Sequence, residues 1–184
     1  LCGMHEYRCP LCQEPLPPAA GNGHRLCPNC ADLLAPRRGG FCPLCGEIAA
    51  DETLTVTPCE LCMQRAGGQF TLLPWQGFCF YAAYAGPLRA CILAFKMHGR
   101  LGLGALLQEL MLCAWRNNSH RLDMPDLVVP VPLHARRLRK RGFNQSLELA
   151  RPLARMLQKP LAACALKRTR ATTPQFQLEF SQRT

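Results

Sequence analysis

Eight cysteines in the first third of the chain have the spacing of metal ligands. They form four C-x-x-C pairs: Cys9/Cys12, Cys27/Cys30, Cys42/Cys45 and Cys59/Cys62. Two intervening residues allow one tight turn to aim both sulfurs of a pair at a single tetrahedral ion. The eight thiols therefore predict two sites of four thiolates each, with no coordination position left open for a substrate. We expect two structural zinc ions.

The four pairs can be grouped into two sites in three ways. The pattern C-P-L-C-x-E occurs at Cys9 and again at Cys42, and this internal repeat favours a sequential grouping. The first two pairs would then form one site and the last two pairs the other. Each repeat is long enough for a short hairpin between its pairs and resembles a zinc ribbon. An interleaved arrangement of the pairs stays open from the spacing alone.

Paired cysteines also occur in disulfides, in thioredoxin-like redox sites, in iron–sulfur sites and in simple packing. We expect a cytoplasmic chain without membrane insertion, because prolines and glycines interrupt the longest uncharged stretch, residues 66–88, and no leader pattern precedes Cys9. Thirteen cysteines in a reducing compartment favour metal ligation over disulfides. Iron–sulfur ligation is then the main competitor of zinc.

The positive charge of the chain is confined to its C-terminal part. The net charge is +10, and residues 131–184 hold twelve Lys and Arg but only two acidic residues, Glu148 and Glu179. Five of these cations lie within six residues: Arg136, Arg137, Arg139, Lys140 and Arg141. Like charges at this density repel one another unless an anion lies among them. The expected anion is a phosphate, a pyrophosphate or nucleic acid, and the alternative is a solvated surface run.

The elements around these cations are predicted from hydrophobic patterning. Residues 78–84 and 126–133 are expected to be strands, and the second should end at its prolines and lead into a basic loop. Gly142, Phe143, Asn144 and Gln145 continue that loop, and a helix is expected from about Ser146, kinked or delayed by Pro152.

Two further helices are predicted between these strands. One begins at Pro87, carries Leu88, Cys91, Ile92 and Phe95 on its apolar face and ends at Gly99; the other has an apolar stripe over residues 103–115. The expected organisation is a metal module over residues 1–65, a linker over 66–77 and an α/β domain over 78–184.

The motifs together resemble the ComF/GntX family. The resemblance is carried by the C-x-x-C array, by F-K-M-H-G-R at residues 95–100, by V-P-V-P-L-H-A-R-R-L-R-K-R-G-F-N-Q at 129–145 and by L-K-R-T-R-A-T-T-P-Q at 166–175. It covers practically the whole chain. It implies a double zinc ribbon followed by a type I phosphoribosyltransferase-like α/β domain, and a role in natural competence, DNA uptake or the use of extracellular DNA.

The resemblance also implies roles for individual residues. Residues 136–145 would form the pyrophosphate-side loop of a site for a ligand of the phosphoribosyl diphosphate type. A mobile loop over that site would contain Arg168, Arg170, Thr172 and Gln175, with Lys96 nearby on its helix. The family's ribose-phosphate motif, two adjacent acidic residues before a Thr/Gly-rich turn, lies downstream of the segment ending near Arg183. We therefore expect a C-terminally incomplete domain and leave enzymatic activity open.

Two hypotheses about function follow. In the first, a DNA-uptake protein binds a phosphorylated small molecule, as an enzyme when complete or as a sensor. In the second, a non-catalytic zinc-dependent module binds single-stranded DNA, although Phe143 is the only aromatic residue near the basic loop and such modules usually stack bases on aromatic rings. Proteins of the DNA-uptake machinery are expected partners. A degenerate family member with a structural role is a third interpretation.

Overall fold

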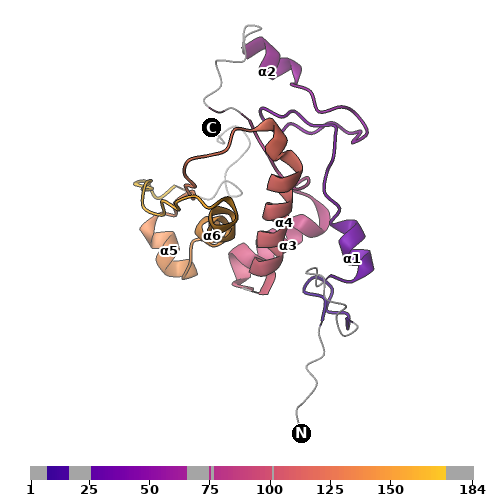
Figure 1. Cartoon of the computed structure of the whole chain (residues 1–184). Helices are drawn as coiled ribbons and strands as arrows, with labels where there is room; N and C mark the ends of the chain where they lie inside the picture. Colours follow the sequence, from indigo (N-terminus) through magenta and orange to yellow (C-terminus); the bar gives the residue numbers. More distant parts are fainter. Residues whose placement is uncertain (1–7, 17–25, 66–74, 76, 101, 173–184) are drawn as a thin grey trace. The chain divides into compact units, whose positions relative to one another are not determined.

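The computed structural model describes residues 8–16, 26–65, 75, 77–100 and 102–172 (Figure 1). Between Pro125 and Asp126 the chain divides into two compact units. The first unit contains the cysteine array and a helical pair, and the second contains the basic segment. This division falls later in the sequence than the expected end of the metal module, because the helical pair belongs to the first unit.

A short helix begins within the second cysteine pair of each repeat. Helix α1 spans Pro28–Leu33 and helix α2 spans Glu60–Arg65. Cys27 precedes α1 in extended conformation, and Pro28 opens the helix, where its missing N–H would be unsatisfied in any case. The last cysteine of each repeat therefore lies on the first turn of a helix.

The helical pair of the first unit confirms the two helices that the sequence predicts before the basic segment. Helix α3 spans Gly86–His98, helix α4 spans Gly102–Asn118, and a 3-10 turn, η2, covers Ser119–Arg121. Gly99 ends α3 in the left-handed conformation, with a φ of 61° that favours glycine. The chain then reverses, and α3 packs against α4.

The apolar faces of α3 and α4 form the helical core of the first unit. The buried residues are Leu88, Cys91 and Phe95 from α3 and Leu103, Leu106, Leu107, Leu110 and Ala114 from α4. A Cβ atom at Gly104 would lie 3.1 Å from the Phe95 ring, so the absence of a side chain there lets the ring approach α4 closely. This core confirms the predicted stripes and the assignment of Cys91 to packing.

The second unit holds helices α5, Ala135–Arg141, and α6, Gln145–Leu157. Ahead of them, Val128 pairs in parallel with Leu161. The Val128 N–H donates to the Pro160 carbonyl at 3.0 Å, and the Val128 carbonyl accepts from Ala162 at 2.9 Å. Helix α6 starts where it was expected and continues through Pro152, with Ala150 and Ala154 buried.

The expected strands are not found in the described residues, where β pairing consists of three isolated bridges: Arg8–Pro15, Phe41–Ile48 and Val128–Leu161. The strand prediction for residues 78–84 is wrong because this segment bonds to the second cysteine repeat and to the residues just ahead of that repeat. The Phe78 N–H donates to the Pro43 carbonyl at 2.7 Å, and the Tyr81 carbonyl accepts from Arg37 N–H at 2.8 Å. The predicted strand over residues 126–133 is reduced to one bridge, so the expected α/β sheet is not confirmed in this part of the chain.

The predicted loop conformation of the basic segment is also wrong, because Arg136, Arg137, Arg139, Lys140 and Arg141 lie on α5. The His134 side chain caps this helix by accepting a hydrogen bond from the Arg136 N–H at 3.2 Å. Gly142 ends it with a φ of 83°, and the Gly142 N–H donates to the Leu138 carbonyl at 2.8 Å. Within the described ranges, no helix combines the length and apolar character needed to cross a bilayer.

Candidate metal centres and anion site

Each cysteine repeat begins with the same tight turn. In the first repeat the Cys9 N–H donates to the Glu14 carbonyl at 2.8 Å, inside the Arg8–Pro15 bridge. In the second repeat the Cys42 N–H donates to the Glu47 carbonyl at 2.8 Å, inside the Phe41–Ile48 bridge. Gly46 has a φ of 79° and allows the second turn to close. Both turns thus point a pair of sulfurs toward the short helix that carries the other pair.

The sulfurs form two clusters, and both contain consecutive pairs. One cluster consists of Cys9, Cys12, Cys27 and Cys30 and the other of Cys42, Cys45, Cys59 and Cys62, with all four sulfurs of each cluster within 4.8 Å of one another. The sequential grouping of the pairs is therefore confirmed.

The distances between sulfurs match a shared metal ion. The Sγ atoms of Cys12 and Cys27 are 3.6 Å apart, and those of Cys45 and Cys59 are 3.7 Å apart. A tetrahedral zinc ion with Zn–S bonds of about 2.3 Å places its sulfurs about 3.8 Å from one another. A disulfide requires about 2.05 Å, and these eight cysteines are free thiols. Both clusters can therefore hold a four-coordinate metal ion.

The thiol pKa values show why each cluster favours a cation. Burial raises the pKa of Cys9, but hydrogen bonds from backbone N–H groups outweigh it and lower the value to about 6. Burial also raises the pKa of Cys42, and backbone hydrogen bonds again outweigh it and lower the value to about 7. Burial, reinforced by neighbouring thiols, raises the pKa of Cys30 and brings that of Cys62 to about 12. Each cluster therefore ionises in part, and a bound cation would allow all four thiolates to form.

The second cluster is supported by contacts that the sequence analysis missed. The Arg37 guanidinium donates to the carbonyls of Gly39 at 2.9 Å, Gly40 at 3.1 Å and Ala49 at 2.6 Å. The Trp75 indole N–H donates to the Leu44 carbonyl, between the two cysteines of the turn. The sequence does not predict these contacts of Arg37, because its partners are backbone carbonyls, which every residue has.

The basic segment of the second unit brings together some of the predicted ligand-binding residues. The Arg137 guanidinium donates to the Thr172 carbonyl at 2.5 Å, and the Arg168 guanidinium donates to the Thr172 hydroxyl at 2.6 Å. A cation from α5 and a cation from the segment after α6 therefore converge on one residue. Arg170, two residues before Thr172 in the chain, is exposed.

Other members of the predicted set lie elsewhere. Arg136, Arg139 and Lys140 are exposed on α5, and Lys96 is exposed on α3 of the first unit. Gln175 lies outside the described residues. Which of these side chains contact a ligand stays a prediction.

Arg141 and Gln145 form a second contact in the basic segment. The Arg141 guanidinium donates to the Gln145 side-chain carbonyl at 2.7 Å across the turn between α5 and α6. Burial lowers the pKa of Arg141, and the positive charge of Arg137 adds to this effect. The guanidinium nevertheless stays charged, because arginine does not lose its proton in proteins.

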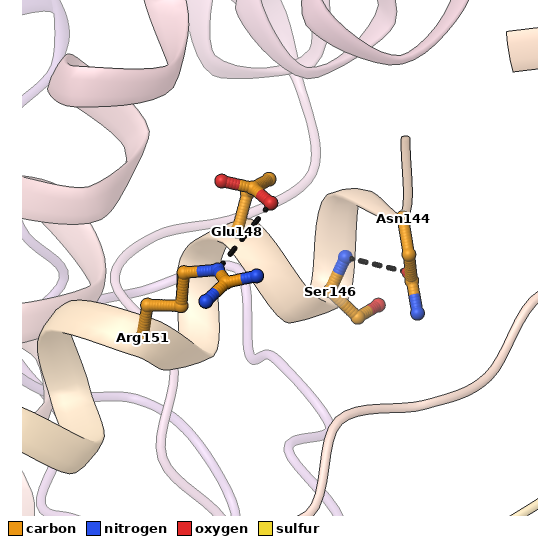
Figure 2. Close-up of polar contacts among 4 residues, drawn as sticks. All are labelled: Asn144, Ser146, Glu148 and Arg151. Carbon is orange, nitrogen blue, oxygen red and sulfur yellow. Dashed lines mark hydrogen bonds and ion pairs between the residues drawn. The ribbon is translucent and has the colours of Figure 1, made fainter. Parts of the chain in front are cut away.

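Asn144 connects the two helices to the segment before them. Its Oδ1 atom accepts a hydrogen bond from the Ser146 N–H at 3.1 Å and so caps α6 (Figure 2). Its Nδ2 atom donates to the Val131 carbonyl at 3.1 Å. The sequence analysis assigned Asn144 to ligand binding, and in the structure its amide positions α6.

We expect Asn144→Ala to lower the free energy of unfolding of the chain by about 1 to 2 kcal/mol, because both the cap and the contact with Val131 are lost. Urea unfolding followed by circular dichroism measures this loss. Asn144→Asp keeps the capping oxygen and should recover most of the cap's share. An equal loss in both variants would contradict a capping role for the side chain.

Comparison with known proteins relates most of the chain to proteins from several bacteria. The chain is 35% identical over 172 residues to DNA utilization protein YhgH of Salmonella typhimurium, and the alignment covers 92% of this chain and 70% of that protein. The protein of the same name from Escherichia coli K12 is 35% identical over 170 residues, covering 91% and 69%. Competence protein F of Haemophilus influenzae is 27% identical over 185 residues, covering 100% and 75%.

No family model and no solved structure matches the chain. The alignments with these relatives extend over more than nine tenths of the chain. The family that its motifs resemble is thereby shown, and the chain belongs to the ComF/GntX family.

Proposed function

We propose that this chain is a zinc-stabilised protein of DNA uptake or DNA use, and that its second unit binds a phosphorylated ligand of the phosphoribosyl diphosphate type. The names of its relatives, DNA utilization protein and competence protein F, support the role in DNA use. The main support for a phosphorylated ligand is that the guanidinium groups of Arg137 and Arg168 both contact Thr172.

Zinc is the metal that the donor set fits best. Four thiolates in a closed tetrahedron are typical of structural zinc, and soft sulfur ligands disfavour calcium and magnesium. The turns and short helices around both clusters have the layout of zinc ribbons. We assign one structural zinc ion to each cluster, with no part in a chemical step.

The chemistry of the basic segment supports an anionic ligand. Arg137 and Arg168 contact a neutral residue through its carbonyl and hydroxyl oxygens. A phosphate oxygen is a stronger acceptor for a guanidinium than a neutral oxygen, and it can bind two N–H groups at once. A phosphorylated ligand would therefore replace Thr172 as the partner of these guanidinium groups. The exposed cations of α5 would add attraction at longer range.

We expect Arg137→Gln to weaken binding of phosphoribosyl diphosphate by at least about tenfold, since one charge-assisted hydrogen bond is worth roughly 1.5 to 3 kcal/mol. Isothermal titration calorimetry with the magnesium salt of the ligand measures the affinity. Arg116→Gln removes the same charge from the last turn of α4 in the first unit and serves as the control.

Three results of this titration, run also with single-stranded DNA as the ligand, would separate the hypotheses. Saturable binding by the wild type that Arg137→Gln weakens and Arg116→Gln does not would support the proposed ligand. A wild-type chain that does not bind phosphoribosyl diphosphate would overturn it. Binding of single-stranded DNA in place of phosphoribosyl diphosphate would favour the non-catalytic nucleic-acid module, for which exposed Arg136, Arg139 and Lys140 are suitable phosphate contacts.

A further inference from the structure

The C-terminal half of α6 borders a groove in the second unit that lies outside the proposed ligand site. The groove has a volume of about 610 Å³ and is lined by three cations, Arg151, Arg155 and Lys159. Its remaining lining comes from Ala154, Gln158 and residues 160–161. We call it the α6 groove. None of its lining residues belongs to α5 or to the Arg168–Thr172 segment.

The walls of the α6 groove are held by backbone hydrogen bonds. At the end of the helix the Lys159 N–H donates to the Ala154 carbonyl at 3.0 Å, and Gln158 adopts the left-handed conformation that turns the chain. The following residues are fixed by the pairing of Leu161 with Val128. These bonds fix the end of α6 and the segment after it, which both line the groove.

The charge of the groove is uncompensated by its own lining, which contains no acidic residue. Glu148 contacts Arg151 at 3.5 Å from one turn earlier on α6 (Figure 2). Both side chains are about half exposed, at 52% for Arg151 and 39% for Glu148, so water weakens this pair. Arg155, one turn further along, is exposed on the same face as Arg151.

Two apolar residues in the lining of the α6 groove, which we call its floor, are Ala154 and Leu161. Ala154 is 4% exposed, and Leu161 is partly buried. A bare phosphate would use the cations and leave this floor and most of the volume unfilled. Sites for small organic ligands have volumes of roughly 300 to 1,000 Å³ and combine an apolar surface with a few charged groups.

We infer that the α6 groove is a binding site for a nucleotide unit, whose phosphate contacts the three cations and whose sugar or base lies on the apolar floor. Guanidinium groups also stack on bases, so Arg155 can contact both parts of the ligand. The unit could be a free mononucleotide or one link of single-stranded DNA, which share this chemistry. Only the choice of a nucleotide over other phosphorylated molecules rests on the proposed role in DNA use.

The test is fluorescence anisotropy with the full zinc-loaded chain and a short fluorescein-labelled oligothymidylate. The double variant Arg155→Gln/Lys159→Gln should bind the probe at least about tenfold more weakly than the wild type. Gln158→Glu, which adds a negative charge at an exposed position of the rim, should also weaken binding. The control, Arg38→Gln/Arg116→Gln, removes two exposed charges from the first unit and should bind like the wild type.

Competition identifies the form of the ligand. Displacement of the probe by deoxythymidine monophosphate, but not by deoxythymidine, would support a site for free nucleotides. Displacement by unlabelled oligothymidylate alone would support a site for single-stranded DNA. Polyglutamate that competes equally well at the same charge would overturn the inference, as would unchanged binding in both groove variants with helical circular dichroism intact.

The outcome is separable from that of the proposed function. The groove variants should bind phosphoribosyl diphosphate like the wild type, because they leave Arg137 and Arg168 in place. A chain that binds the labelled probe through the α6 groove but does not bind phosphoribosyl diphosphate would overturn the proposed ligand and support the groove. A wild-type chain that does not bind the probe would overturn the groove alone.

Discussion

Replacing Cys30 by serine is expected to remove one of two zinc ions and to unfold the first cysteine repeat. Cys30 is 4% exposed, and its sulfur belongs to the cluster with Cys9, Cys12 and Cys27. A structural zinc ion contributes apparent binding free energy on the order of 10 kcal/mol, and in small zinc domains this is folding free energy. The repeat has little apolar core of its own to compensate, since Cys9, Cys30 and Leu34 are the buried residues described between positions 8 and 34.

Native mass spectrometry measures this result directly. The wild-type chain should carry two zinc ions and Cys30→Ser one, and a strong chelator should remove both with loss of structure. Cys164→Ser is the matched control, because Cys164 is an exposed cysteine outside both clusters. Two zinc ions on Cys30→Ser, or iron in place of zinc on the wild type, would contradict the assignment.

Phe95→Ala is expected to lower the free energy of unfolding by about 3 to 5 kcal/mol, the second largest effect. Phe95 is 3% exposed, and its ring lies against the backbone of α4 at Gly104. Truncation loses the contacts of the ring and leaves a cavity between two helices that the reversal at Gly99 holds together. Refilling that cavity would require the helices to move closer, and the other buried leucines oppose this movement.

Lys96 provides the control for this substitution because it follows Phe95 on α3 and is exposed. Lys96→Ala should change the free energy of unfolding by less than about 0.5 kcal/mol. Urea unfolding of zinc-loaded protein, followed by circular dichroism, compares the two variants. A loss below about 1 kcal/mol for Phe95→Ala would mean that α3 and α4 contribute little to the cooperative unit.

The sequence predicts the metal clusters and the α3–α4 pair because both depend on local rules. A C-x-x-C turn fixes the spacing of its two sulfurs, and the repeat correctly indicates which pairs combine. The apolar period of α3 and α4 likewise requires one buried face per helix, and the left-handed glycine between them marks the reversal. In these elements, local preference and tertiary packing agree.

The predictions failed where the partner of a segment is distant in sequence. Residues 78–84 have the composition of a strand, but the Phe78 N–H donates to the second cysteine repeat. Phe80 also contacts Phe41 ahead of that repeat's first cysteine, with ring centroids 4.9 Å apart. In the basic segment, Gly142 was expected to continue a loop. The stretch before it consists of good helix formers, so the same glycine serves as the C-terminal cap of α5.

The ligand contacts were the least predictable part of the candidate site. Charge density identifies the basic segment, but it does not distinguish Arg137, which reaches Thr172, from Arg136, which is exposed. The α6 groove was missed because its lining combines residues of a helix, Arg151, Ala154 and Arg155, with residues 158–161 of the chain after it. A groove along a helix can be predicted only when the segment that packs beside the helix is known.

The second cysteine repeat shares its supports with residues that follow it in the chain. Phe78 covers Gly46, and the Arg121 guanidinium lies 5.4 Å from the centre of the Phe41 ring. A gene fragment ending at Cys62 would therefore encode a cysteine repeat without the residues that pack against one side of it. Recombination could not readily transfer this repeat alone to another protein, because the residues up to η2 would have to be transferred with it.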